Sequence, residues 1–251
     1  MVTKKKPKAK AKPAPGKRRR KTPARKGLWR WALRPLRWAA YGFAAICLWV
    51  ASYTVIDPPG GFYMASEWVR LGKIERDWRD LGQMAPHVPR AVMAAEDANF
   101  CLHWGFDLKA IGNALAANSE GGRVRGASTI TQQVAKNLFL WHGRSWVRKG
   151  LEAGFALLIE AIWSKRRIVE VYLNVAEFDE GAFGIQAAAR RYFTQNASGL
   201  SLAQAARLAA ILPDPKDRNA AAGTDFMRRR AVAIADGART LAADGRDDCL
   251  E

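Results

Sequence analysis

Three polar residues at helical spacing are the first candidates for chemistry. Thr129, Gln133 and Lys136 lie in the run GASTITQQVAKN at positions 126–137. If this run is helical after Ser128, the three side chains fall within roughly 60° of one another around the axis, because each residue turns the helix by about 100°. One helix face then carries a hydroxyl, an amide and an ammonium group. This face is typical of a binding site for an oxygen-rich anion, and a capped surface helix with a chance polar stripe is the alternative.

Two acidic residues are candidates for the same chemistry. Glu96 is four residues from both Val92 and Phe100, so a helix would place its carboxylate within an inward-facing apolar stripe. Burial raises the pKa of a carboxyl group and makes it a proton acceptor near neutral pH, although a salt-bridged Glu at a helix end is the alternative. Glu152 shares a helix face with Arg148, where a surface ion pair is the simplest interpretation. Two carboxylates beside a cationic helix suit reaction at a sugar anomeric carbon with an anionic leaving group.

The elements that must position these residues are helices. After Gly60, apolar residues in most alanine-rich segments recur at about 3.6-residue spacing, with neither an alternating strand pattern nor an internal repeat. The 251 residues are enough for one good core but hardly for two full domains. We therefore predict an all-α domain, with helices over 65–83, 89–100, 107–118, 128–140, 145–163, 165–176, 181–193, 201–212 and 226–242.

Basic residues are concentrated at the N-terminus. Residues 1–37 contain 16 of the 41 lysines and arginines, no acidic residue and few apolar ones, so we predict a disordered tail. The next 19 residues, 38–56, carry no charge and have aromatic residues near both ends, which is typical of a segment that crosses the bilayer once. A cleaved signal peptide and a buried helix are the alternatives. The basic side is expected to stay cytoplasmic, which makes DNA binding by the tail a minor alternative.

The predicted organisation has five parts. They are a basic tail (1–37), a transmembrane anchor (38–56), a membrane-proximal region (57–84), the main domain (85–243) and a solvated C-terminal tail (244–251). Of the three cysteines, Cys47 lies in the anchor, while Cys101 and Cys249 either form one disulfide in an oxidising compartment or stay reduced. The chain has three histidines and no CxxC pair, which argues against a structural zinc site.

Five motifs occur in order along the second part of the chain. They are EDxxFxxHxGxD at 96–107, GxSTITQQxxKN at 126–137, RKxxE at 148–152, KRRIVEVYLN at 165–174 and AAxLAAxLPxP at 205–215. With these motifs the chain resembles the monofunctional biosynthetic peptidoglycan glycosyltransferases of glycosyltransferase family 51. Those are membrane-anchored, lysozyme-like enzymes that polymerise lipid II. The resemblance covers about residues 60–220.

The resemblance implies a role for each candidate residue. Glu96 would be the general base that takes the proton of the incoming sugar's 4-hydroxyl, and Glu152 would organise the site or help to bind a divalent ion. Lys136 and Arg148 would stabilise the charge of the pyrophosphate. The other residues implied in substrate binding are Ser128, Thr129, Gln132, Gln133 and Asn137, and those implied in the structure of the first motif are Asp97, Phe100, His103, Gly105 and Asp107.

The resemblance also implies partners and a location. The substrates would be lipid II and the nascent glycan strand, in contact with membrane lipids, and proteins of cell-wall synthesis or division are further candidates. Nucleic acid is not an expected partner. No tightly bound cofactor is implied, apart from a divalent cation, Mg²⁺ or Mn²⁺. The catalytic domain would be periplasmic at the bacterial inner membrane, with a single pass and a cytoplasmic N-terminus.

Small departures from the family pattern leave the proposed roles untouched. Gln204 stands where the fifth motif usually has Glu, and Val169 where the fourth usually has Leu. None of the serines from Ser52 to Ser201 begins a Ser-x-x-Lys motif, so we expect glycan polymerisation without cross-linking. The closest alternative function is a lysozyme-like hydrolase or lytic transglycosylase. A non-enzymatic scaffold is the alternative from a different class.

Overall fold

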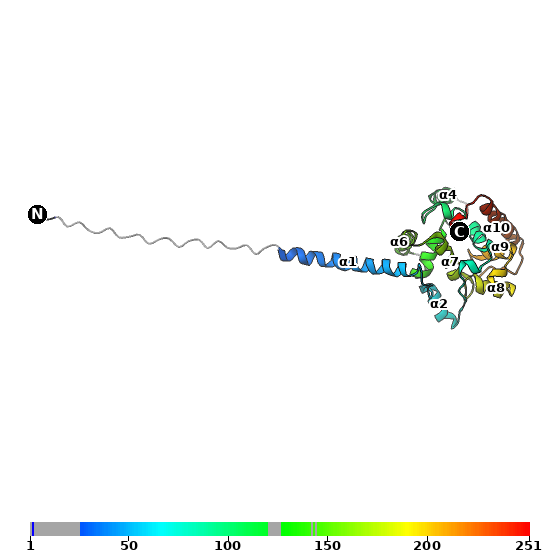
Figure 1. Cartoon of the computed structure of the whole chain (residues 1–251), viewed down its shortest axis with the longest axis horizontal. Coiled ribbons are helices and arrows are strands. Elements are labelled where there is room, and N and C mark those ends of the chain that lie inside the picture. The colour runs from blue at the N-terminus through cyan, green and yellow to red at the C-terminus, as the bar shows by residue number, and fades with distance from the viewer. Residues whose placement is uncertain (1, 3–25, 120–126, 142, 144) are drawn as a thin grey trace. The chain divides into compact units, whose positions relative to one another are not determined.

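The computed structural model describes residue 2 and residues 26–119, 127–141, 143 and 145–251. The chain divides into two compact units, Met1–Ala45 and Ile46–Glu251. All elements from α2 onward belong to the second unit (Figure 1). Most of the predicted tail at 1–37 lies outside the described residues.

Helix α1 spans Lys26–Ser52 and contains Pro35. It begins inside the tail predicted to be disordered, since residues 26–37 are helical, and it ends four residues before the end of the anchor predicted at 38–56. In the part of the chain that the structure describes, no helix combines the length and the apolar character needed to cross a membrane.

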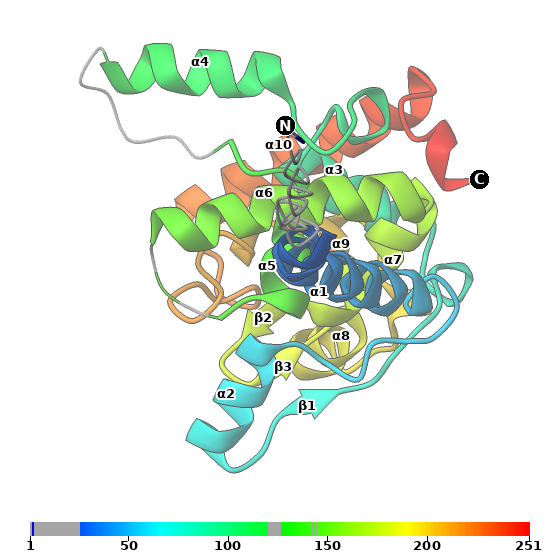
Figure 2. The same cartoon turned by 90° about the vertical axis from the view of Figure 1, so that its left-hand side faces the viewer.

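Two groups of helices form the body of the second unit (Figure 2). In one group, α3 (His87–Glu96), α9 (Leu202–Ile211) and α10 (Asp225–Ala243) pack against one another. In the other, α5 (Ile130–Phe139) packs against α6 (Trp146–Ile162) and α7 (Lys165–Val175). The predicted helical class is thus confirmed, and from α4 (Leu108–Ser119) onward the bounds lie within two residues of prediction for every helix except α8 (Ile185–Phe193).

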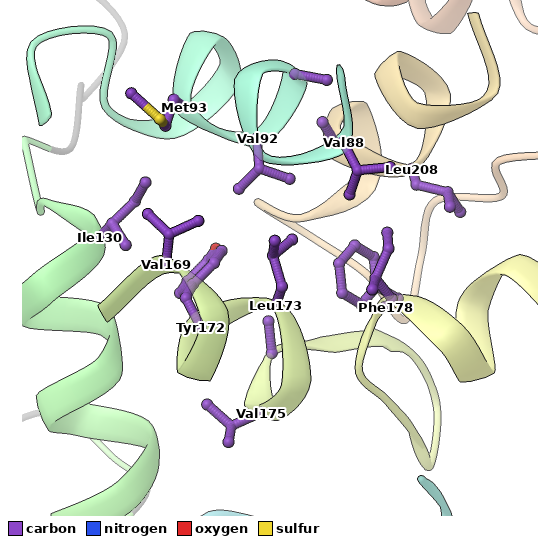
Figure 3. Packing of buried hydrophobic residues seen from close by; sticks show 14 of the residues in the cluster. Val88, Val92, Met93, Ile130, Val169, Tyr172, Leu173, Val175, Phe178 and Leu208 are labelled. Carbon is purple, nitrogen blue, oxygen red and sulfur yellow. The ribbon is translucent and has the colours of Figure 1, made fainter. Parts of the chain in front are cut away.

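A continuous apolar core joins the two groups (Figure 3). Val92 and Met93 of α3 face Ile130 of α5 and Tyr172 and Leu173 of α7, and all five side chains are buried. Burying a large apolar side chain stabilises the fold by about 1.5–3 kcal/mol. The core therefore holds α3, α5 and α7 in a defined arrangement, and these helices carry most of the polar candidates.

The prediction of one helix over 65–83 is wrong. Helix α2 (Phe62–Leu71) ends at Gly72, whose φ of 74° lies in the left-handed region that favours glycine. A short strand, β1 (Glu75–Arg76), and a 3₁₀ turn, η1 (Leu81–Gln83), follow.

The structure also contains a small sheet that the sequence did not predict. Its order is β1-β3-β2, with β3 (Ala182–Phe183) parallel to β1 and antiparallel to β2 (Glu177–Asp179). Strands of two or three residues are too short for an alternating pattern to stand out. The sheet takes the start of the helix predicted over 181–193, so α8 begins only at Ile185.

The C-terminal residues 244–251 are not the solvated tail that we predicted. Leu250 is buried, Arg90 forms an ion pair with Asp247, and Cys249 is bonded to Cys101. The apolar side chain of Leu250 and the cross-link give this segment interactions that outweigh its acidic composition. The open alternative for the two cysteines is thereby decided in favour of the disulfide.

Loss of the Cys101–Cys249 bond is expected to lower stability. The two cysteines are 148 residues apart, and a cross-link that closes a long loop typically contributes about 2–4 kcal/mol. Cys249→Ser should therefore lower the midpoint of thermal unfolding, and a reductant should lower that of the wild-type protein but not that of the variant. Equal midpoints for the oxidised wild type and the variant would contradict a stabilising bond.

Candidate active site

Glu96 is the last residue of α3, and the core holds that helix in place. Its side chain is half-buried, and one carboxylate oxygen, Oε2, accepts a hydrogen bond of 2.8 Å from Nε2 of Gln133. Burial raises the pKa of Glu96 above the ordinary carboxyl range, against the opposing effects of the Gln133 hydrogen bond and the charges of Arg230 and Lys136. A carboxylate in this state is suited to accept a proton near neutral pH.

Gln133 comes from the polar face of α5 and lies between two partners. Besides donating to Glu96, it accepts a hydrogen bond of 3.2 Å at Oε1 from the hydroxyl of Tyr172. This face of α5 therefore points to Glu96 on α3 as well as to the cations of α6 described below.

Thr129 and Gln132 start the helix. Thr129 is the N-cap of α5, and its hydroxyl accepts from the backbone N–H of Gln132 and donates to the carbonyl of Gly105 at 2.7 Å. The Gln132 side chain accepts in turn from the N–H of Thr129 at 3.1 Å, which completes a capping box. Both side chains are buried and engaged within the protein.

Lys136 is half-buried on the same helix, one turn after Gln133. Its ammonium group forms no hydrogen bond or ion pair with another described residue. Burial lowers the pKa of Lys136, which the charge of Glu152 counteracts, while Arg148 and Lys149 lower it further. A cation that is partly removed from water without a bonded counter-ion is the feature expected where an anionic ligand binds.

Glu152 of α6 forms ion pairs with two cations of the same helix. Nη1 of Arg148 donates to Oε2 of Glu152 at 3.0 Å, and Lys149 donates to the other oxygen. Nζ of Lys149 also lies 3.2 Å from Oγ of Ser128, which precedes α5. Nε of Arg148 is buried and has no hydrogen-bond partner among the described residues. The buried Glu152 thus orients a cationic pair beside the polar face of α5.

Asn137 lies near the end of α5, against the segment that precedes α2. A Cβ atom on Gly61 would lie only 1.8 Å from the backbone oxygen of Asn137. This close approach requires glycine at position 61 and brings the start of α2 against α5.

The first motif holds the beginning of α5 in place. Asp97 is buried and accepts from the backbone N–H of Ile130 at 3.1 Å, and its other oxygen lies 2.9 Å from Nε2 of His103. Gly105 has a φ of 79°, and its carbonyl accepts the hydroxyl of Thr129. The residue after Glu96 is therefore bonded directly to the helix that carries Gln133 and Lys136.

Two further members of this motif have structural contacts. Asp107 accepts from the N–H of Ala110 in the first turn of α4 at 2.8 Å and from Asn99 at 2.9 Å, and the backbone hydrogen bond holds its pKa below the ordinary value. Phe100 is fully buried, with the ammonium group of Lys165 4.3 Å from its ring centre. These contacts fix the turn between α3 and α4.

The described residues do not fit a divalent cation at Glu152. Both of its oxygens already accept hydrogen bonds from the cations Arg148 and Lys149. Among the residues that the structure describes, no group of three or more His, Cys, Asp or Glu side chains is placed to hold a metal ion. Mg²⁺ and Mn²⁺ prefer several oxygen ligands, so this donor set does not suit either ion.

Sequence reasoning gave no role to three residues at the site, although two of them, Lys149 and Tyr172, lie within the RKxxE and KRRIVEVYLN motifs. Lys149 is three residues before Glu152, and this spacing could have identified it. Tyr172 and Arg230 approach Gln133 and Glu96 from α7 and α10, and sequence spacing carries no signal for contacts over such separations. Nε of Arg230 is buried without a hydrogen-bond partner among the described residues.

The site has three parts that belong together chemically. Glu96 can accept a proton, Lys136 can bind an anion, and the pair formed by Arg148 and Lys149 adds positive charge close to Lys136. The structure thus brings together Glu96, Gln133, Lys136, Arg148 and Glu152, as well as Ser128. It places Thr129, Gln132, Asp97, His103, Gly105 and Asp107 in contacts that hold these elements.

Comparison with known proteins identifies the family of the chain. A family model described as transglycosylase matches residues 65–239. Two similar proteins are biosynthetic peptidoglycan transglycosylases. The one from Jannaschia sp. (strain CCS1) is 52% identical over 88% of this chain and 90% of its own length, and the one from Pseudomonas syringae pv. syringae (strain B728a) is 46% identical over 84% and 91%. The chain therefore belongs to the transglycosylase family.

Proposed function

We propose that this chain is a peptidoglycan glycosyltransferase that polymerises lipid II. Glu96 takes the proton from the 4-hydroxyl of the N-acetylglucosamine of an incoming lipid II. That oxygen attacks the anomeric carbon of the terminal N-acetylmuramate of the growing strand and inverts it to a β-1,4 bond. The bond from the anomeric carbon to the pyrophosphate oxygen breaks, and its electron pair leaves with undecaprenyl pyrophosphate.

The observation that carries this proposal is the pairing of a proton acceptor with an unneutralised cation. The carboxylate of Glu96 has a neutral amide as its hydrogen-bond partner, and Lys136 on the same helix as that amide has no bonded counter-ion among the described residues. A pyrophosphate leaving group requires positive charge more than it requires a proton donor. Lys136 and Arg148 supply that charge, and Glu152 orients Arg148 and Lys149.

The remaining predicted substrate-binding residues divide into two groups in this proposal. Ser128 and Asn137, at the two ends of α5, border the anion site. Thr129 and Gln132 position the helix through the capping box, in which the Thr129 hydroxyl and Oε1 of Gln132 are bonded within the protein, and we assign neither residue a substrate contact.

Incubation of the purified full-length chain with lipid II tests the function. Growth of a glycan polymer with release of undecaprenyl pyrophosphate supports it. A lysozyme-like hydrolase or lytic transglycosylase would instead cleave finished glycan, and that result would replace the proposal. A scaffold without enzymatic activity would do neither.

The same proposal predicts polymerisation without cross-linking. No serine of the chain begins the Ser-x-x-Lys motif of penicillin-binding transpeptidases. A labelled β-lactam should therefore leave the chain unacylated.

We further propose that the catalytic domain acts at the periplasmic face of the inner membrane. The run of 19 uncharged residues at 38–56 and the basic segment before it support a single-pass anchor with a cytoplasmic N-terminus. Membrane lipids, and proteins of cell-wall synthesis or division, would then be its neighbours. Recovery of the full chain from the aqueous fraction of lysed cells would contradict the anchor.

Deletion of residues 1–30 is expected to leave catalysis in detergent unchanged. This segment is basic and contains none of the residues that form the candidate site. The measurement is the rate of lipid II polymerisation by the truncated and full-length chains in the same detergent. A large loss of rate would show that the tail does more than orient the protein.

A further inference from the structure

The amide of Gln133 is held from two sides by groups on other helices. Its Nε2 donates to Oε2 of Glu96 at 2.8 Å, and its Oε1 accepts from the hydroxyl of Tyr172 at 3.2 Å. The three residues come from α5, α3 and α7, the helices that the core joins. A hydrogen-bonded line therefore runs from the buried core to the candidate base.

Tyr172 is a fixed donor in this line. Its side chain is fully buried in the core, with its ring beside Leu173 and Val169 (Figure 3). Burial, and to a lesser degree the charge of Glu96, raises the pKa of the Tyr172 hydroxyl well above its usual value. The hydroxyl therefore keeps its proton at neutral pH.

The two partners determine which way the amide points. An ionised carboxylate only accepts hydrogen bonds, so the nitrogen of the Gln133 amide must face Glu96. The amide oxygen then faces Tyr172, whose proton it accepts. A flipped amide would place oxygen against a carboxylate and would lose the bond to the anion.

We propose that Gln133 is a positioning residue for Glu96 and that Tyr172 holds it in that role. The amide fixes the carboxylate through Oε2 and leaves Oε1 of Glu96 to receive the proton of the incoming sugar hydroxyl. This inference rests on the proposed function of Glu96 as the base. It changes the role that the resemblance implied for Gln133, which was substrate binding.

Other charged groups act on Glu96, and the test must leave them in place. Arg230 of α10 and Lys136 of α5 favour its ionised form, whereas the neighbouring carboxylate of Asp97 disfavours it. Tyr172 of α7 is the titratable group that faces Glu96 through Gln133. Replacing Gln133 or Tyr172 by a neutral residue removes hydrogen bonds to or through the amide but leaves the charges of Arg230, Lys136 and Asp97 in place.

Gln133→Met and Tyr172→Phe test the proposal in the full-length chain. Methionine keeps the length of the side chain, and phenylalanine keeps the ring in the core. Gln133→Met removes a hydrogen bond to a charged group, and this loss should lower kcat for lipid II by about 10- to 100-fold, with KM unchanged. The acid limb of the kcat profile should move to higher pH, because the ionised form of Glu96 loses its donor. Tyr172→Phe should shift kcat and the acid limb in the same direction by less.

Tyr63→Phe is the matched control. The Tyr63 hydroxyl also donates to a carboxylate, that of Glu177, and both residues lie outside the candidate site. This variant should keep the wild-type kcat and acid limb. If Gln133→Met raises KM while kcat and the acid limb stay as in the wild type, Gln133 binds substrate directly and the proposal is overturned.

A titration without substrate separates this inference from the proposed function. The Glu96 carboxyl carbon can be followed by NMR in protein labelled with ¹³C-glutamate, and Glu96→Gln identifies its signal. In Gln133→Met the titration of this signal should move to higher pH, and an unmoved titration overturns the positioning role. If Gln133→Met does not fold, the same titration of the Glu96 signal is measured in Tyr172→Phe, where a smaller shift to higher pH is expected. Failure of the wild-type chain to polymerise lipid II refutes the function but leaves this titration result in force.

Discussion

Glu96→Gln is expected to reduce lipid II polymerisation by about 100- to 10,000-fold, the usual contribution of a positioned general base. Glutamine has nearly the shape of glutamate but cannot accept the proton of the attacking hydroxyl. The measurement is the rate of polymer formation by purified full-length protein. Retention of more than a small fraction of the wild-type rate would remove Glu96 from the role of base.

The pH dependence of the polymerisation rate is a second test of Glu96 as the base. The base must be ionised, so the wild-type rate should fall as the pH drops through the pKa of Glu96. Burial raises that pKa above the ordinary carboxyl range, and the acid limb should accordingly lie above the range of exposed glutamates. The residual rate of Glu96→Gln should lack this limb.

Stability distinguishes loss of chemistry from loss of fold. Because the pKa of Glu96 is raised in the folded state, the folded protein binds this proton at pH values where the unfolded chain has released it. Ionisation of Glu96 therefore lowers the free energy of unfolding as the pH rises between the unfolded and the folded pKa. At neutral pH, Glu96→Gln should be at least as stable as the wild type, and any gain should vanish below the ordinary carboxyl pKa. A strong destabilisation would mean that Glu96 is needed for folding.

The candidate site was predictable to the extent that it lies in local patterns. The spacing of Gln133 and Lys136 on one helix face is a property of that helix alone, and so is the i,i+4 pair of Arg148 and Glu152. A helical pattern shows which residues share a face but not what that face meets. The contact of Gln133 with Glu96, 37 residues earlier in the chain, depends on how the shared core places α3 relative to α5. Arg230 could be found only from the position of α10.

Elements stabilised by few residues were the ones that the sequence did not predict. Strand β1 owes its pairing to a neighbour about 100 residues away, since Glu75 pairs with Ala182, and β2 and β3 pair locally but are only two or three residues long. The end of α2 depends on the backbone conformation of Gly72, although the apolar pattern continues beyond it to Trp78. The composition of the C-terminal residues is polar, yet the Cys101–Cys249 disulfide and the buried side chain of Leu250 attach them to the domain.

Lys136→Met is expected to cause the second large loss of activity. Methionine keeps the apolar part of the side chain, so the packing of α5 should persist while the charge is removed. The groups nearest in function, Arg148 and Lys149, are already bonded to Glu152 and cannot replace the lysine without breaking those bonds. In the proposed reaction, negative charge grows on the pyrophosphate oxygen as the glycosidic bond breaks, and the interaction with Lys136 would therefore be strongest in the transition state.

The expected fall in kcat for Lys136→Met is about 100- to 1,000-fold, comparable to the removal of one donor from an oxyanion hole. The control is Lys73→Met, which removes the charge of an exposed lysine outside the site and should keep the wild-type rate. Lys136→Arg restores the charge with a different shape and should recover part of the loss. Burial lowers the pKa of Lys136, so the wild-type rate should decline at high pH earlier than the titration of an exposed lysine would predict. If Lys136→Met raised only KM, the lysine would hold the substrate equally in the ground state and would not assist departure of the pyrophosphate.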